Sequence, residues 1–201
     1  MISGTDQKLA PLTEEELTAR IRPLATATYA VDYPWSGTDR MLDWLADGSG
    51  SPVELEPDFQ RGHVWTPAQQ VAFIENALRG VLDQAAYAIR FNAPAWQAEP
   101  TGDLPATVQC VDGLQRLTAV RQFLAGDVRP FGLHVDQLTG TPYRVAGASN
   151  RFRFRVMVYT FQWRADLLQH YLDLNAGGTP HSADEIARVR GLLNTASESR
   201  G

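Results

Sequence analysis

The chain has 201 residues, of which 44% are hydrophobic and 20% charged, a balance typical of a globular protein rather than a disordered one. Its net charge of −5 argues against broad electrostatic capture of nucleic acid. Because Cys110 is the single cysteine, an internal disulfide and a cysteine-rich zinc site are excluded. The sequence has no apolar run near the roughly 20 residues that span a bilayer, and no signal-peptide pattern. We therefore expect a cytoplasmic protein without a membrane partner.

Residues 1–25 are polar and acidic, with one short helical stretch around Thr13 to Ile21. We expect them to form a loosely attached N-terminal arm, and residues 26–201 to form a single domain. A short helix is expected from Asp39 to Leu45, followed by a turn in the Gly- and Ser-rich run 47–52.

A capping residue, a proline at the first helical position and a glutamine three residues after the cap predict a helix that begins after Thr66. Gly80 is expected to end it. Apolar residues recur on one face of this helix, at Val71, Ile74, Leu78 and Val81. A strand over 85–92, a loop from about 93 to 105 and a second strand over 107–111 follow.

The next predicted unit is a tight turn at Gly113 and a helix that ends near Gly126, because apolar residues recur at helical spacing from Leu114 to Leu124. Alternating residues predict a strand over 151–159, and a helix follows over about 164–174. A capping box at 182–185 opens a last helix through Leu193. The fold class is therefore α+β, with a small mixed sheet surrounded by helices.

Three polar clusters interrupt this pattern where two elements meet. The first is Asp112–Arg116, where a strand delivers Gly113 to a helix N-terminus, which favours a phosphate. Arg116 is suited to the same phosphate, and Gln115 to orienting a water or an acceptor hydroxyl. Asp112 is suited either to a divalent cation such as Mg²⁺ or to capping the helix.

The second cluster is the segment 57–65, which precedes the helix after Thr66. Arg61 suits a phosphate. Trp65 is suited to stacking on a base, although packing in the core is the commoner role of such a residue. His63, without a second histidine or cysteine nearby, is a poor metal ligand candidate. The third cluster is the turn 175–182, where Asn175, Thr179 and His181 add polar groups to a glycine pair.

In this order the clusters resemble the ParB/sulfiredoxin-like N-terminal domain of GmrSD-type modification-dependent restriction enzymes. The matching residues are Gln60, Arg61, Gly62 and Trp65, then Asp112, Gly113, Gln115, Arg116, Leu117 and Thr118, then Asn175, Gly177, Gly178 and Thr179. Leu114 departs from the family pattern, which usually has glutamine there.

The resemblance implies a nucleoside triphosphate site. It implies that Asp112, Gln115 and Arg116 line the triphosphate. The chemistry of the residues themselves adds Asp58, as an alternative to Asp112 for orienting the acceptor, and makes Asp112 the candidate ligand of Mg²⁺. The nucleotide-binding residues of the site would be Gln60, Arg61, Gly113, Arg116, Thr118, Asn175, Gly177, Gly178 and Thr179, and its substrate contacts His63, Trp65 and His181.

We therefore expect a phosphoryl-transfer enzyme that uses ATP or GTP with Mg²⁺ in a bacterial or phage-infected cell. The first interpretation is a kinase whose acceptor is a metabolite hydroxyl or a hydroxymethylated base in viral DNA. One alternative is an NTPase sensor subunit of a modification-dependent restriction or phage-defence system, working with a separate nuclease subunit. The other is a non-catalytic NTP-gated module that binds DNA or a partner.

Overall fold

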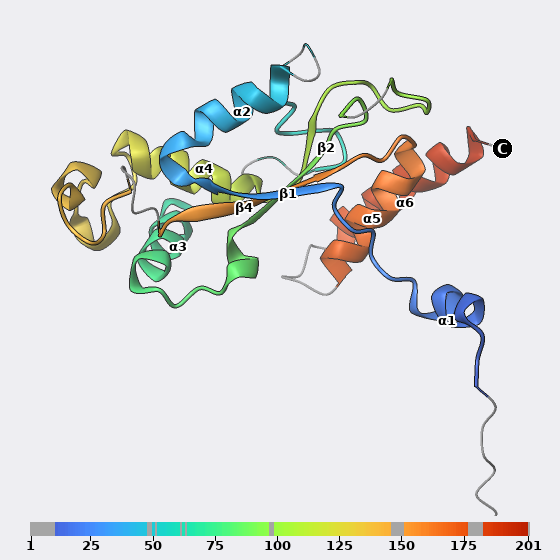
Figure 1. The fold of residues 1–201 in the computed structure, drawn as a ribbon, viewed down its shortest axis with the longest axis horizontal. Coiled ribbons are helices and arrows are strands. Elements are labelled where there is room, and N and C mark those ends of the chain that lie inside the picture. Colours follow the sequence, from blue (N-terminus) through green and yellow to red (C-terminus); the bar gives the residue numbers. More distant parts are fainter. Residues whose placement is uncertain are drawn as a thin grey trace, which may run out of the picture.

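The computed structural model describes residues 11–47, 50, 52–60, 62, 64–96, 99–145, 151–176 and 183–200. Within them the elements follow in the order α1 (Glu14–Ile21), β1 (Tyr29–Pro34), α2 (Thr38–Asp47), α3 (Pro67–Arg79), β2 (Ala88–Asn92), β3 (Gln109–Asp112), α4 (Leu114–Ala125), β4 (Arg153–Tyr159), α5 (Arg164–Ala176) and α6 (Ala183–Glu198) (Figure 1). Short 3-10 turns lie at Trp35–Gly37, Gln84–Tyr87, Pro130–Gly132 and Val135–Leu138.

The strands form one mixed sheet in the order β1-β4-β2-β3. β4 pairs antiparallel with β1 and parallel with β2, and β2 pairs antiparallel with β3. A small mixed sheet with helices around it confirms the α+β class. The finer expectation of a ParB/sulfiredoxin-like fold stays a prediction.

Two hydrophobic clusters form the core of the described residues, and β3 contributes to both. Cys110 belongs to the cluster under α2, α3 and α4, and Val111 belongs to the cluster formed with α5 and α6. Successive strand residues point to opposite faces of a sheet, so the two clusters lie on opposite sides of β3. Figure 1 shows α5 and α6 grouped together, away from α3 and α4. β3 therefore ends between two packed layers.

Helix α3 begins and ends as expected. Thr66 and Gln69 form the capping box, Pro67 occupies the first helical position, and Gly80 ends the helix with φ 74°. The expected apolar face is wrong at one position, because Val81 lies beyond the end of the helix and is 69% exposed.

The strand boundaries differ from the sequence expectations. Residues 84–87 form a 3-10 turn rather than the start of a strand, because the Asp83 carboxylate accepts a hydrogen bond of 3.0 Å from the Ala86 N–H. The strand expected over 107–111 is Gln109–Asp112, and the last helix extends to Glu198. Strand β1 is not predicted from the sequence pattern at all.

Helix α1 starts with a capping box between Thr13 and Glu16 and buries none of its residues. It lies apart from the body of the protein in Figure 1. The division into an arm over 1–25 and a domain over 26–201 stays a prediction. Among the described residues, no helix has the length and apolar character needed to cross a membrane.

Candidate functional site

The junction between β3 and α4 is a turn that only glycine fits. Gly113 is the N-cap of α4 with φ 105°, and no side chain caps this end of the helix. A Cβ atom at Gly113 would lie 3.0 Å from the Ile89 Cα and 3.1 Å from the Ala88 carbonyl oxygen. Glycine therefore lets the turn pack directly on β2. The expectation that Asp112 caps the helix is wrong, because its carboxylate points to two arginines instead.

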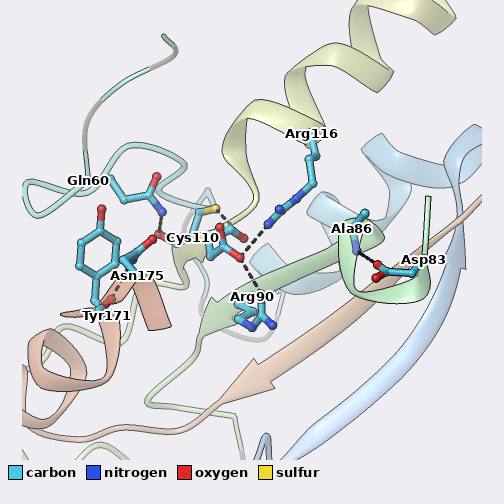
Figure 2. Close-up of polar contacts among 9 residues, drawn as sticks. Gln60, Asp83, Ala86, Arg90, Cys110, Arg116, Tyr171 and Asn175 are labelled. Atoms are coloured by element: carbon cyan, nitrogen blue, oxygen red, sulfur yellow. Dashed lines mark hydrogen bonds and ion pairs between the residues drawn. The ribbon is translucent and has the colours of Figure 1, made fainter. Parts of the chain in front are cut away.

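Asp112 forms ion pairs with Arg90 and Arg116. Arg90 Nη1 and Arg116 Nη2 donate to the same oxygen, Asp112 Oδ2, at 2.6 and 2.7 Å (Figure 2). The Nε atoms of both arginines are buried and have no hydrogen-bond partner among the described residues. Two guanidinium groups against one carboxylate make this cluster net positive. Arg90 was missed by sequence reasoning, although a charged residue inside the apolar run 88–92 was a usable signal.

Gln115 connects the first polar cluster to the second. Its Oε1 accepts hydrogen bonds of 2.9 Å from the Val64 and Trp65 N–H groups, and its Nε2 donates to the Gly62 carbonyl at 3.2 Å. The side-chain amide is thus engaged by the loop that precedes α3. In this arrangement Gln115 positions the loop, rather than presenting its amide to a water or a substrate hydroxyl.

Described residues of all three clusters line a small pocket of about 80 Å³, and Asn175 represents the third cluster there. It is lined by Gln60 of the second cluster, by the turn at Asp112–Gln115, and by Tyr171 and Asn175 of α5, with Val111 as an apolar wall. Gln60 Nε2 donates to the Cys110 carbonyl, and Asn175 Nδ2 donates to the Tyr171 carbonyl at 2.7 Å (Figure 2). Residues more than 50 positions apart in the sequence are therefore brought to one place.

Four other predicted site residues do not line this pocket, and one of them is Arg116, whose guanidinium contacts Asp112. The Asp58 carboxylate pairs with Arg164 at 2.6 Å, its side chain is 61% exposed and it does not line the pocket, so its catalytic role stays a prediction. Trp65 is half-buried against Phe73, with ring centroids 5.5 Å apart, as a core residue would be. Thr118 is half-buried on α4 and does not line the pocket. Arg61, His63, Gly177, Gly178, Thr179 and His181 lie outside the described residues.

The surroundings of Asp112 do not fit the expected magnesium ligand. The guanidinium groups of Arg90 and Arg116 already contact Asp112 Oδ2, and their charge opposes a cation there. In this arrangement the carboxylate of Asp112 forms ion pairs with the two arginines rather than binding a metal ion.

Two buried titratable groups lie next to the site. Burial raises the pKa of the Cys110 thiol to about 12, an effect partly offset by a hydrogen bond from Gln60, so this thiol is not a nucleophile at neutral pH. Burial also lowers the pKa of His170, and the positive charge of Arg90 lowers it further. His170 packs against Tyr159, with ring centroids 4.6 Å apart. A neutral His170 therefore lies near the arginine cluster.

The fold and the site define an α+β domain with an arginine-rich strand–turn–helix junction. The chain belongs to the family of the N-terminal domain of the GmrSD restriction endonuclease, which it matches over residues 45–185. This range includes all three polar clusters and confirms the resemblance seen in the sequence. The curated proteins and the solved structures give no significant match.

Proposed function

We propose that this protein is a nucleoside triphosphate-binding sensor subunit of a restriction or defence system. In this proposal the phosphates bind beside Gly113, within reach of Arg90 and Arg116. The observation that carries the proposal is the Arg90–Asp112–Arg116 cluster at the start of α4, beside the pocket that described residues of all three polar clusters line.

Charge and geometry at this junction favour an anion. The N-terminus of α4 has no side-chain cap, and a helix N-terminus carries unpaired N–H groups and a partial positive charge. The contact with Asp112 uses one nitrogen of each arginine, so other N–H groups of both guanidiniums remain for phosphate oxygens. Asp112 holds the two like charges together, which makes it a positioning residue for the arginines.

The sensor is favoured over the kinase. The family is that of a restriction endonuclease, and no specific observation favours a hydroxyl acceptor. Asp58 is one candidate residue to take the proton of an acceptor hydroxyl, but it pairs with Arg164 outside the pocket. Leu114 replaces a glutamine of the family pattern and is only 5% exposed, within the core. We therefore expect tight binding with slow hydrolysis, and a signal that passes to a separate nuclease subunit acting on modified DNA.

Thermal unfolding in the presence of nucleotides tests this proposal. We expect at least one of ATP, GTP, CTP and UTP, with Mg²⁺, to raise the Tm of the wild type, because a ligand that binds the folded state stabilises it. Arg116→Ala should abolish this increase. Arg121→Ala is the matched control, since Arg121 lies on the same helix and pairs with the exposed Asp39. A wild type whose Tm no nucleotide changes would refute the proposal.

A radiolabelled γ-phosphate separates the two enzymatic interpretations. The sensor predicts slow release of inorganic phosphate and no label on free serine or on hydroxymethylated nucleotides. Label on any of these acceptors, released phosphate being the minor product, would instead establish the kinase.

A further inference from the structure

A second concave surface adjoins the small pocket. It is a groove of about 420 Å³ along α5 and α6, and the residues Tyr171 and Asn175 line both this groove and the small pocket. The two cavities are therefore neighbours with a common wall. Among the described residues of the three polar clusters, Asn175 lines this groove.

The sizes of the two cavities assign different parts of a nucleotide to them. Clefts that bind small organic ligands measure roughly 300–1,000 Å³. The groove falls in this range, whereas the small pocket at about 80 Å³ is too small for a base and a sugar. A nucleotide with a phosphate beside Gly113 must therefore place its base and sugar elsewhere, and the groove is the adjoining cavity large enough to take them.

The lining of the groove has the chemistry that a nucleoside needs. Its apolar residues are Leu172, Ile186, Val189 and Leu193, and its polar ones include Gln169, Asp173, Arg190 and Asn194. A nucleobase has an apolar face, which suits the leucine and isoleucine side chains, and a hydrogen-bonding edge, which suits amides. Gln169 Nε2 donates a hydrogen bond of 2.9 Å to Asp173 Oδ1, so the Asp173 carboxylate is held in place at the groove.

Arg22, from the N-terminal segment, also lines the groove. It lies immediately after α1, in a left-handed conformation with φ 47°, and lines the groove together with residues of α5 and α6. A positive φ is unusual for a residue other than glycine. This conformation turns the chain from α1 toward β1 beside the groove, where Arg22 contributes a positive charge.

We propose that the α5–α6 groove binds the nucleoside part of the triphosphate. This inference rests on the proposed function, since it needs the phosphates to bind beside Gly113. It assigns base selectivity to exposed polar side chains of α5 and α6, and Asn194 of α6 is one of them.

Isothermal titration calorimetry with two kinds of ligand tests this inference. The nucleotides ATP, GTP, CTP and UTP would occupy both cavities, whereas inorganic tripolyphosphate would occupy the phosphate site alone. Asn194→Trp should fill the groove and weaken the preferred nucleotide by about tenfold or more, a loss of about 1.4 kcal/mol. The affinity of the Asn194→Trp variant for tripolyphosphate should equal that of the wild type. The matched control is Thr195→Trp, because Thr195 is also exposed on α6 but does not line the groove.

The outcomes separate the two proposals. A wild type that binds neither nucleotide nor tripolyphosphate refutes the proposed function and this inference together. If the wild type binds both but Asn194→Trp changes neither affinity, or weakens both equally, only the nucleoside groove is wrong. Photolabelling of the wild type with a base-azido derivative of the preferred nucleotide is independent of any substitution. Label on peptides of α5 or α6 is expected, and label confined to other elements would overturn the inference.

Discussion

Arg90 of β2 and Asp112 of β3 lie opposite each other in the antiparallel register and form an ion pair of 2.6 Å. Asp112 is followed directly by Gly113 and α4, so the strand pairing that aligns this ion pair also fixes the start of the helix. Arg116, one turn into α4, completes the cluster. The sheet register and the helix start are therefore two parts of one site.

Replacing Arg90 should weaken nucleotide binding. We expect Arg90→Ala to reduce the affinity for the preferred nucleotide by about 10- to 100-fold, the size of one or two charge-assisted hydrogen bonds. Arg90→Lys keeps the charge but loses the planar fork, so its affinity should be intermediate. Calorimetric titration measures both. Wild-type affinity in Arg90→Ala would show that Arg90 only supports Asp112.

Gly113→Ala should destabilise the fold more than an alanine at another glycine with positive φ. The added Cβ would meet the backbone of β2 at 3.0 Å, whereas a Cβ added at Gly132, with φ 74°, would have nothing within 4 Å. We expect Gly132→Ala to lower the free energy of unfolding by about 1 kcal/mol, because of the unfavourable backbone conformation alone. Gly113→Ala should lower it by about 2 kcal/mol more, because the added Cβ contacts β2. Urea unfolding of both variants checks this. Equal losses would mean that the turn relaxes away from β2.

Gln115→Ala should release the loop before α3 from α4. The substitution removes three hydrogen bonds, two of them to the N–H groups of Val64 and Trp65. We expect faster hydrogen exchange at these two amides and a loss of about 1–2 kcal/mol in unfolding free energy. Gln122→Ala, two turns along α4, is the control and should leave both amides protected. Unchanged exchange in Gln115→Ala would show that other contacts hold the loop.

The stability of the protein should fall as the pH drops below about 6.5, in part because of His170. Burial, with Arg90 nearby, lowers the pKa of His170 below its unfolded value of 6.5, so the unfolded state binds a proton more readily. The stabilisation is therefore complete above pH 6.5 and is lost as the pH falls through that value toward the folded-state pKa. Urea unfolding at pH 7.5 and 5.5 should show a smaller pH dependence in His170→Phe, which keeps an aromatic ring beside Tyr159. An identical pH dependence in this variant would exclude His170 as a contributor.

Features of the sequence that act over a few neighbouring residues predict a large part of this fold. The cap at Thr66, the proline after it and the glycine at the end predict α3 because each acts within one helical turn. Apolar spacing after Gly113 likewise predicts α4. The three ordered polar clusters also indicate the family from the sequence alone, because the order of short motifs along a chain needs no knowledge of how the chain folds.

Which of these residues act together depends on the tertiary packing. Strand β1 forms because it pairs with β4, which lies more than 100 residues further along the chain. A local sequence pattern does not indicate so distant a partner. The same holds for Asp58, whose partner is Arg164, and for Asp112, whose partner in β2 depends on the register of two strands. Ion pairing and strand register depend on distances in space, whereas periodicity and capping depend on distances along the chain. The sequence therefore predicts where polar clusters begin, and the packing of the sheet decides which charges meet.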